Sequence, residues 1–315
     1  MTSPLTHARP HRRLAAVSVV LLALVGSALA GCGGDDDSSS ADDSGVTTTS
    51  AATDEGTTDD TAPGDGDGDA DAAGTETLEI LVTNDDGYDA DGIDAVAEAL
   101  AALEGAEVVV VAPLEQQSGR GGTFTDGPVA SAEAETASGR PVTTVDGFPA
   151  DAVRVALEEM GLEPDLVVSG INEGQNVGPL VDVSGTVGAA RAGAAGGVPS
   201  LAVSSGLPIP SDYDAAIPFV VDWVEESLDA LLAEEAPVEV ASINVPTCTA
   251  GEIRGLAEVD PGTSGNPLDP QDCTSTLEDP VDDVEAFVNG FATLSVVPDE
   301  PDTPPEAVDP DAVEE

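Results

Sequence analysis

The chain has no lysine, and all eight of its basic residues are arginine. Against them stand 62 acidic residues, so the 315-residue chain carries a formal net charge of −54. Residues 1–32 hold three of the arginines and no acid, which leaves 62 acids against five arginines, or −57, in the rest. So much negative charge repels nucleic-acid backbones and anionic lipid headgroups. The composition therefore argues against a nucleic-acid partner and against membrane binding through charged side chains.

Histidine is almost as scarce as lysine. His7 and His11 are the only two in the sequence, and both lie close to its start. A metal site in the body of the chain would therefore depend on oxygen ligands. Such ligands favour Mg²⁺, Mn²⁺ or Ca²⁺ over Zn²⁺.

Residues 1–32 have the pattern of an export signal. A head with three arginines precedes the apolar, uncharged run 14–30, which leads into Leu29-Ala30-Gly31-Cys32. This tetrapeptide resembles the lipobox of bacterial lipoproteins, in which the signal is removed before a cysteine that then carries lipid. The alternative is a transmembrane anchor, but a span needs about 20 apolar residues. We therefore expect an extracytoplasmic protein held on the cell membrane by lipid on Cys32.

Two segments are too polar to form a core. Residues 33–76 are mainly Asp, Ser, Thr, Gly and Ala, and residues 299–315 are rich in Pro, Asp and Glu. We expect both to be disordered, the first as a tether with a reach of roughly 35 Å and the second as a tail. The folded domain is then expected over residues 77–298.

Cys248 and Cys273 are the two cysteines of this expected domain. If Cys32 carries lipid, they form an even pair in an oxidising compartment, where a disulfide can persist. The alternative is two buried, inert thiols, because spacing alone does not give the separation of two side chains.

Between residues 77 and 298, apolar runs alternate with amphipathic ones. This alternation predicts an α/β fold, a Rossmann-like three-layer arrangement with a mostly parallel sheet. The expected strands are 78–83, 107–111, 142–145, 165–169, 200–203 and 238–244, with a late one within 290–297. The expected helices are 92–103, 150–160, 185–195 and 213–232, the third built from small residues that would allow close approach to the sheet.

The first expected strand stops at Asn84-Asp85-Asp86-Gly87. Taken alone, these residue types are typical of a plain turn. However, ligands of open α/β sheets bind outside the carboxyl ends of the strands. Two adjacent carboxylates at this position could hold a hard cation.

Three further polar segments follow expected strands or open an expected helix. A flexible loop carries Ser118, a glycine-rich turn spans 169–178, and Ser184-Gly185-Thr186 opens the small-residue helix with Ser184 as candidate N-cap. Each is more often structural when it occurs alone. A parallel sheet would place all of them on one rim, where a helix start can bind phosphate.

These motifs together resemble the survival protein SurE family of metal-dependent nucleotidases. The resemblance runs from Glu79 to about Pro298 and includes the NDDG strand end, the AP...SG loop, the SGIN.G.N.G turn, SGTV.AA and Ala202-Val203-Ser204. It implies hydrolysis of nucleoside 5′-monophosphates to nucleoside and phosphate, with 3′-monophosphates as a further candidate class. By position, it implies that Asp85, Asp86, Ser118 and Asn172 bind Mg²⁺ or Mn²⁺, with Ca²⁺ less suited to catalysis. It also implies that Asn84, Asn176 and the helix start Ser184, Gly185 and Thr186 lie beside the phosphate.

The resemblance also implies that Asp85 or Asp86 accepts the proton of the attacking water, and we favour Asp85.

The segment 254–283 is shorter than the arm through which family members oligomerise, so that a homodimer is one expectation and a monomer another. Two other functions stay open from the sequence: a solute-binding lipoprotein with two lobes of similar size, and a former enzyme that keeps only the fold.

Overall fold

The computed structural model describes residues 77–207, 210–298 and 307–308. The expected signal segment with Cys32, the tether and most of the expected tail lie outside these residues. Within the described part, no helix is long and apolar enough to cross a membrane.

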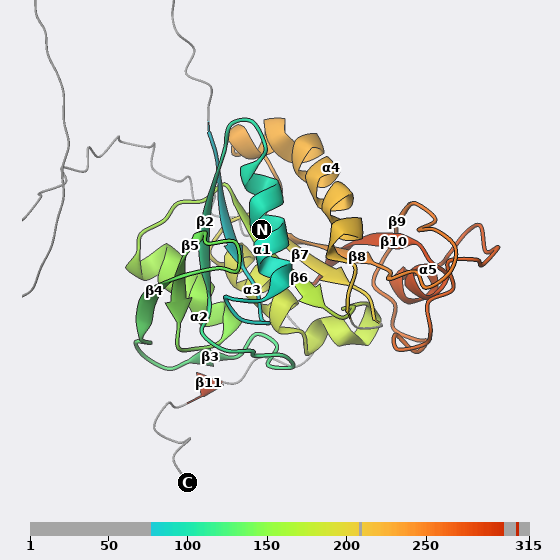
Figure 1. Cartoon of the computed structure of the whole chain (residues 1–315), viewed down its shortest axis with the longest axis horizontal. Coiled ribbons are helices and arrows are strands. Elements are labelled where there is room, and N and C mark those ends of the chain that lie inside the picture. The colour runs from blue at the N-terminus through green and yellow to red at the C-terminus, as the bar shows by residue number, and fades with distance from the viewer. Residues whose placement is uncertain (1–76, 208–209, 299–306, 309–315) are drawn as a thin grey trace, which may run out of the picture. The chain divides into compact units, whose positions relative to one another are not determined.

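A nine-stranded sheet forms the centre of the domain, in the order β4-β5-β2-β1-β6-β7-β8-β10-β9 (Figure 1). Neighbours from β5 to β8 run parallel, whereas β4 is antiparallel to β5 and β10 to β8. The strands of this sheet are β1 (Leu78–Thr83), β2 (Ala106–Pro113), β4 (Ser131–Glu135), β5 (Pro141–Val145), β6 (Leu166–Glu173), β7 (Ser200–Ser205), β8 (Val240–Val245), β9 (Leu256–Glu258) and β10 (Ala292–Val297). The predicted α/β fold with a mostly parallel sheet is therefore confirmed.

Helices cover both faces of the sheet. α1 (Asp91–Ala101) and α4 (Tyr213–Leu232) lie side by side on one face, and α2 (Pro149–Arg154) packs with α3 (Gly185–Ala195) on the other (Figure 1). Ile80 and Val82 of β1 pack under α1 and α4, while Leu81 between them packs toward α2 and α3. Burial on both faces explains why the central strands are continuous apolar runs.

The small residues of α3 allow the close approach expected from the sequence. A Cβ added at Gly193 would lie 2.4 Å from Ser200 Oγ, and one at Gly188 would lie 2.2 Å from the Gly121 carbonyl oxygen. Larger side chains at these positions would push α3 away from β7 and from the loop after β2.

Three differences from the expected elements have clear causes. β6 continues to Glu173 instead of ending at Ser169, because its register shifts between Ser169 and Asn172 and pairing with β7 then resumes. Gly170, with φ of 138°, lies in this irregularity, where an added Cβ would be 2.3 Å from the Val203 carbonyl oxygen. The expected helix over 150–160 is α-helical only to Arg154 and continues as a π-helical turn, Val155–Glu159. The edge strand β4 was not predicted because its residues are mostly exposed and its only apolar residues are two alanines.

The C-terminal part of the described chain gathers at one end of the sheet, around β9, β10 and α5 (Asp283–Val288) (Figure 1). Here Cys248 and Cys273 form a disulfide with Cα atoms 5.8 Å apart. Buried Asp283 accepts backbone N–H groups from Gly178 and Gly262 and so fixes this region to the loop after β6. The remaining short elements are β3 (Phe124–Thr125), which pairs with β11 (Ala307–Val308), and the 3-10 turn Gly178–Asp182.

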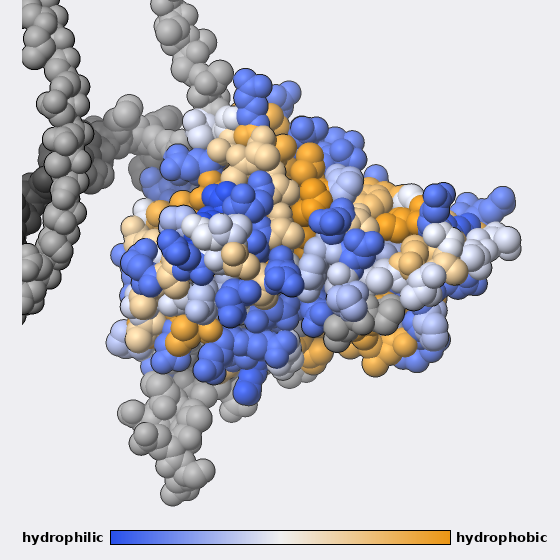
Figure 2. All heavy atoms as spheres, viewed as in Figure 1, coloured by the Kyte–Doolittle hydropathy of each residue, from blue (hydrophilic) through white to orange (hydrophobic). Residues whose placement is uncertain are grey.

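Hydrophilic residues predominate on the surface in Figure 2, and apolar residues show mainly between α1 and α4 and near β9 and β10. All the described strands except β3 and β11 belong to one sheet, unlike the two lobes of similar size expected for a solute-binding lipoprotein.

Candidate active site

The candidate site lies at the switch point of the sheet, where the chain stops adding strands on one side of β1 and begins to add them on the other. From β1 the chain adds β2 on one side, and it later returns to add β6 on the other. Outside the carboxyl ends of two such strands, the connecting segments diverge and leave a crevice in which ligands of open α/β sheets bind. β1 ends here in Asn84-Asp85-Asp86-Gly87, and β6 ends here in Asn172 and Glu173.

Asp85 contacts the start of α3. Its side chain is 3% exposed, and its Oδ1 accepts a hydrogen bond from the Thr186 hydroxyl at 2.6 Å. A Cβ added at Gly185 would lie 2.7 Å from both Cβ and Oδ2 of Asp85, so only glycine fits at this contact. The pKa of Asp85 is raised to about 6, first by burial and then by the charge of Asp86, although the hydrogen bond from the Thr186 hydroxyl opposes both effects.

Asp86 contacts the end of β6. Its Oδ2 accepts the Glu173 backbone N–H at 2.9 Å, and the Gln116 side chain also bonds to it. Burial raises its pKa, while these two bonds lower it. Tyr213 is half-buried near this carboxylate. Burial is the main cause that raises the pKa of its phenol, and the negative charges of Glu173 and Asp86 raise it further. Sequence reasoning missed Gln116, Glu173 and Tyr213, since only the tertiary fold brings them to Asp86.

The loop after β2 is fixed to both β1 and α3. The Gln117 N–H donates to the Asp85 carbonyl oxygen at 2.7 Å, and the Gly121 N–H donates to the Val183 carbonyl oxygen at 3.1 Å. Ser118, the next residue after Gln117, is exposed at this rim. The structure thus brings the backbone of Ser118 beside the Asp85 segment.

Asn172 is buried at the end of β6, next to the residue that binds Asp86. Its Nδ2 donates to the Gly174 carbonyl oxygen at 2.5 Å. Because its amide nitrogen is occupied in this way, the carbonyl oxygen Oδ1 is the atom suited to a cation.

Two predicted phosphate ligands have other partners in this structure. Nδ2 of buried Asn84 donates to the Gly87 carbonyl oxygen at 2.7 Å, and its Oδ1 is buried without a hydrogen-bond partner. Asn176 lies farther along the rim, where its Nδ2 donates to Ser204 Oγ at 2.9 Å and its N–H to Asn244 Oδ1 at 2.6 Å. A phosphate role for these two asparagines stays a prediction.

Ser184 is the N-cap of α3, as its position predicted. Its Oγ accepts the Val187 N–H at 3.1 Å, and the residue is buried. The first turn of α3, with Gly185 and Thr186, faces Asp85 through the contacts described above. The partial positive charge of a helix start therefore lies beside the two carboxylates.

The charges at this site are not balanced by the protein. The described arginines form ion pairs with Glu98, Asp151 and Asp182, and none of these pairs involves Asp85 or Asp86. Two neighbouring buried carboxylates are costly unless something neutralises them. The described residues contain no cluster of three or more His, Cys, Asp or Glu side chains suited to a metal. A cation would therefore be held by two carboxylates plus neutral oxygens, a donor set that suits Mg²⁺ and Mn²⁺.

Comparison with known proteins agrees with this geometry. A sequence model described as survival protein SurE matches residues 80–264. The chain is 41% identical to 5′-nucleotidase SurE of Brevibacillus brevis over 57% of this chain and 70% of that protein. It is 39% identical to 5′-nucleotidase SurE of Thermosipho africanus over 56% and 69%. The crystal structure of the SurE protein from Aquifex aeolicus superposes with a TM-score of 0.58 at 29% identity, covering 70% of this chain and 94% of that one. These matches give no support to the solute-binding alternative, and the chain belongs to the survival protein SurE family.

Proposed function

We propose that this protein is a metal-dependent phosphomonoesterase that hydrolyses nucleoside 5′-monophosphates to nucleoside and phosphate. The observation that carries the proposal is the unneutralised pair Asp85 and Asp86 at the switch point of the sheet, where Asp85 contacts the start of α3 and Asp86 the end of β6. The relatives named 5′-nucleotidase SurE support the same activity.

The residues fit a divalent cation. Asp85 accepts a hydrogen bond from the Thr186 hydroxyl, and Asp86 accepts bonds from Glu173 and Gln116. A carboxylate offers about four lone-pair positions, so both groups can also bind a metal. With Ser118 and Asn172 they would hold Mg²⁺ or Mn²⁺. When bound, such an ion polarises the phosphoryl oxygens and neutralises the charge that develops during transfer.

The protein's own groups would bind the phosphate and accept the proton. The start of α3 is the candidate phosphate site, because the partial positive charge of a helix start favours an anion. Asp85 is our candidate for the general base, because its buried carboxylate lies beside the start of α3, where the phosphate and the attacking water would meet. The net charge of −57 on the chain beyond residue 32 acts on a phosphate dianion mainly at long range, where salt screens it.

Phosphate release tests the proposal directly. Purified protein with Mn²⁺ should release phosphate from AMP or GMP, and Asp86→Ala should abolish the release. Asp279→Ala is the matched control, because Asp279 is an exposed acid in the 254–283 segment. Undiminished release by Asp86→Ala would rule out the assigned site.

We further propose, from the sequence of residues 1–76, that lipid on Cys32 anchors the protein to the outer side of the cell membrane. We also propose that the folded domain forms a homodimer. Cys32→Ser should move the protein from the membrane to the soluble fraction. Sedimentation of the 77–298 domain should give twice the mass of one chain, and a single-chain mass would refute the dimer.

A further inference from the structure

A cavity of about 340 Å³ opens on the same rim as the candidate active site. Its wall comes from the loop after β6, from the ends of β7 and β8, and from residues 268–271. This volume lies in the range of small-molecule sites. The first wall residue, Gln175, is only two positions beyond Glu173, which binds Asp86. Two residues of chain span at most about 7 Å, so the cavity begins close to the carboxylates.

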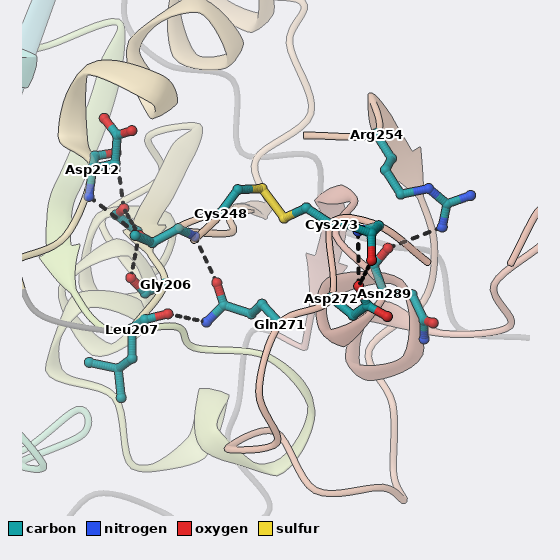
Figure 3. Close-up of a disulfide and its surroundings, with 12 residues drawn as sticks. Gly206, Leu207, Asp212, Cys248, Arg254, Gln271, Asp272, Cys273 and Asn289 are labelled. Atoms are coloured by element: carbon teal, nitrogen blue, oxygen red, sulfur yellow. Dashed lines mark hydrogen bonds between the residues drawn. A yellow bond between two sulfur atoms is a disulfide. The ribbon is translucent and has the colours of Figure 1, made fainter. Parts of the chain in front are cut away.

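Two glutamine side chains of the cavity are held rigidly around Leu207. Gln175 Oε1 accepts the Leu207 N–H at 3.1 Å. Gln271 Nε2 donates to the Leu207 carbonyl oxygen at 2.5 Å, a bond that Figure 3 shows. Gln175 Nε2 also donates to the Pro267 carbonyl oxygen at 2.7 Å, and Gln271 Oε1 accepts the Thr247 N–H at 2.7 Å. A carboxamide has two N–H groups and two acceptor lone pairs, so each keeps one donor and one acceptor in a fixed direction.

The rest of the lining is mixed: Leu207, Leu268 and Pro270 are apolar, whereas Thr247, Thr249 and Asp269 are polar. Leu207 and Leu268 are 37% and 62% exposed, and Pro270 lies beside them. Leu207 Cδ2 reaches to 3.9 Å from the position of a Cβ on Gly174, so its side chain faces the active-site loop. Asp269 is the one ionisable group among the described lining residues, and it is bonded to Asn266 at 2.6 Å. Apolar surfaces with fixed donor and acceptor pairs suit a flat, uncharged ring that carries complementary groups along its edge, as a purine does.

One wall of the cavity comes from residues beyond the family match. The family match ends at residue 264, whereas residues 268–271 follow it. The Cys248–Cys273 disulfide joins the segment after β8 to this wall, as Figure 3 shows. The wall is therefore fixed covalently to the sheet through the residue that follows Thr247.

We propose that this cavity binds the nucleobase of the substrate while the phosphate lies at Asp85 and Asp86. The proposal rests on the proposed nucleotidase function and adds a specificity site to it. Gln175 and Gln271 form hydrogen bonds with the edge of the base, and Leu207 and Leu268 contact its faces.

Comparison of two substrates tests the proposal. AMP carries a base, whereas ribose 5-phosphate offers the same phosphoester without one. The wild type should have a higher kcat/KM for AMP, and Leu268→Asp should reduce that preference by about tenfold by placing a charge in the apolar wall. Leu268 is exposed enough for the variant to fold. Val281→Asp adds the same charge at a side chain that is 78% exposed in the same segment, and it should keep the preference.

The outcomes separate the two proposals. Equal kcat/KM for both substrates in the wild type, or equal losses for both in Leu268→Asp, would overturn the base site while leaving the nucleotidase function intact. If the wild type hydrolyses neither substrate, the proposed function fails, and calorimetry decides the base site. Tighter binding of AMP than of ribose 5-phosphate, lost in Leu268→Asp, would support it, and equal binding would overturn it.

Discussion

Replacing Gly185 with alanine tests whether the start of α3 fixes the position of Asp85. The added Cβ would lie 2.7 Å from Asp85 Cβ. Carbon atoms pack at about 3.5 to 4.0 Å, so the two segments must separate by roughly 1 Å. Overpacking of this kind costs about 1 to 3 kcal/mol of stability. A displacement of 1 Å at a catalytic group can reduce the rate about 10²-fold.

We therefore expect kcat/KM of Gly185→Ala for AMP to fall about 10²-fold in the presence of saturating Mn²⁺. The matched control is Gly193→Ala in the same helix. Its Cβ would lie 2.4 Å from Ser200 Oγ, away from the carboxylates, so it should lose similar stability but keep its activity. Thermal unfolding of both variants separates folding from catalysis. Wild-type kcat/KM in a folded Gly185→Ala protein would refute the inferred contact.

Three further predictions concern stability. The pKa of Asp85 is raised from 3.8 to about 6, chiefly by burial, so the folded, metal-free protein binds this proton more tightly than the unfolded chain does. The free energy of unfolding should therefore fall by up to about 3 kcal/mol as the pH rises from 4 to above 6. Denaturant titrations should show a smaller loss in Asp85→Asn, and equal losses would contradict the assignment. The Cys248–Cys273 bridge joins residues 25 positions apart, and its reduction should lower the free energy of unfolding by about 3 kcal/mol. Reduction should also raise KM for AMP more than KM for ribose 5-phosphate. Unchanged stability and unchanged KM would argue that the bridge does not fix the cavity wall. The net charge of −54 predicts a higher Tm in molar salt, where the screening length is about 3 Å, and a Tm that does not rise would count against a salt-adapted protein.

Elements with strong local patterns were predicted closely from the sequence. The bounds of β1, α3 and α4 match the expected ranges. β1 is an apolar run that stops at NDDG, α3 begins after a Ser N-cap, and α4 is a long amphipathic run, so each element is defined by its own local sequence. The edge strand β4 has no such pattern, since its stability comes from pairing with β5 and not from burial of its side chains.

The site was predicted in outline only. Strand ends and a helix start could be placed on one rim, because parallel strands point the same way. The partners of Asp86 come from β6, from the loop after β2 and from α4, and these contacts depend on tertiary packing that spacing does not encode. The bonds of Asn176 to Ser204 and Asn244 also depend on tertiary packing and were not predicted, and its phosphate role stays a prediction.

Binding of Mn²⁺ to the metal-free protein tests the central claim most directly. Calorimetry should give one ion per chain for the wild type, with binding weakened by alanine at each of Asp85, Asp86, Ser118 and Asn172, and unchanged by Asp279→Ala. Absence of a bound ion, or affinity that is indifferent to Ser118→Ala and Asn172→Ala, would contradict a single cation shared by the ends of β1 and β6 and the loop after β2.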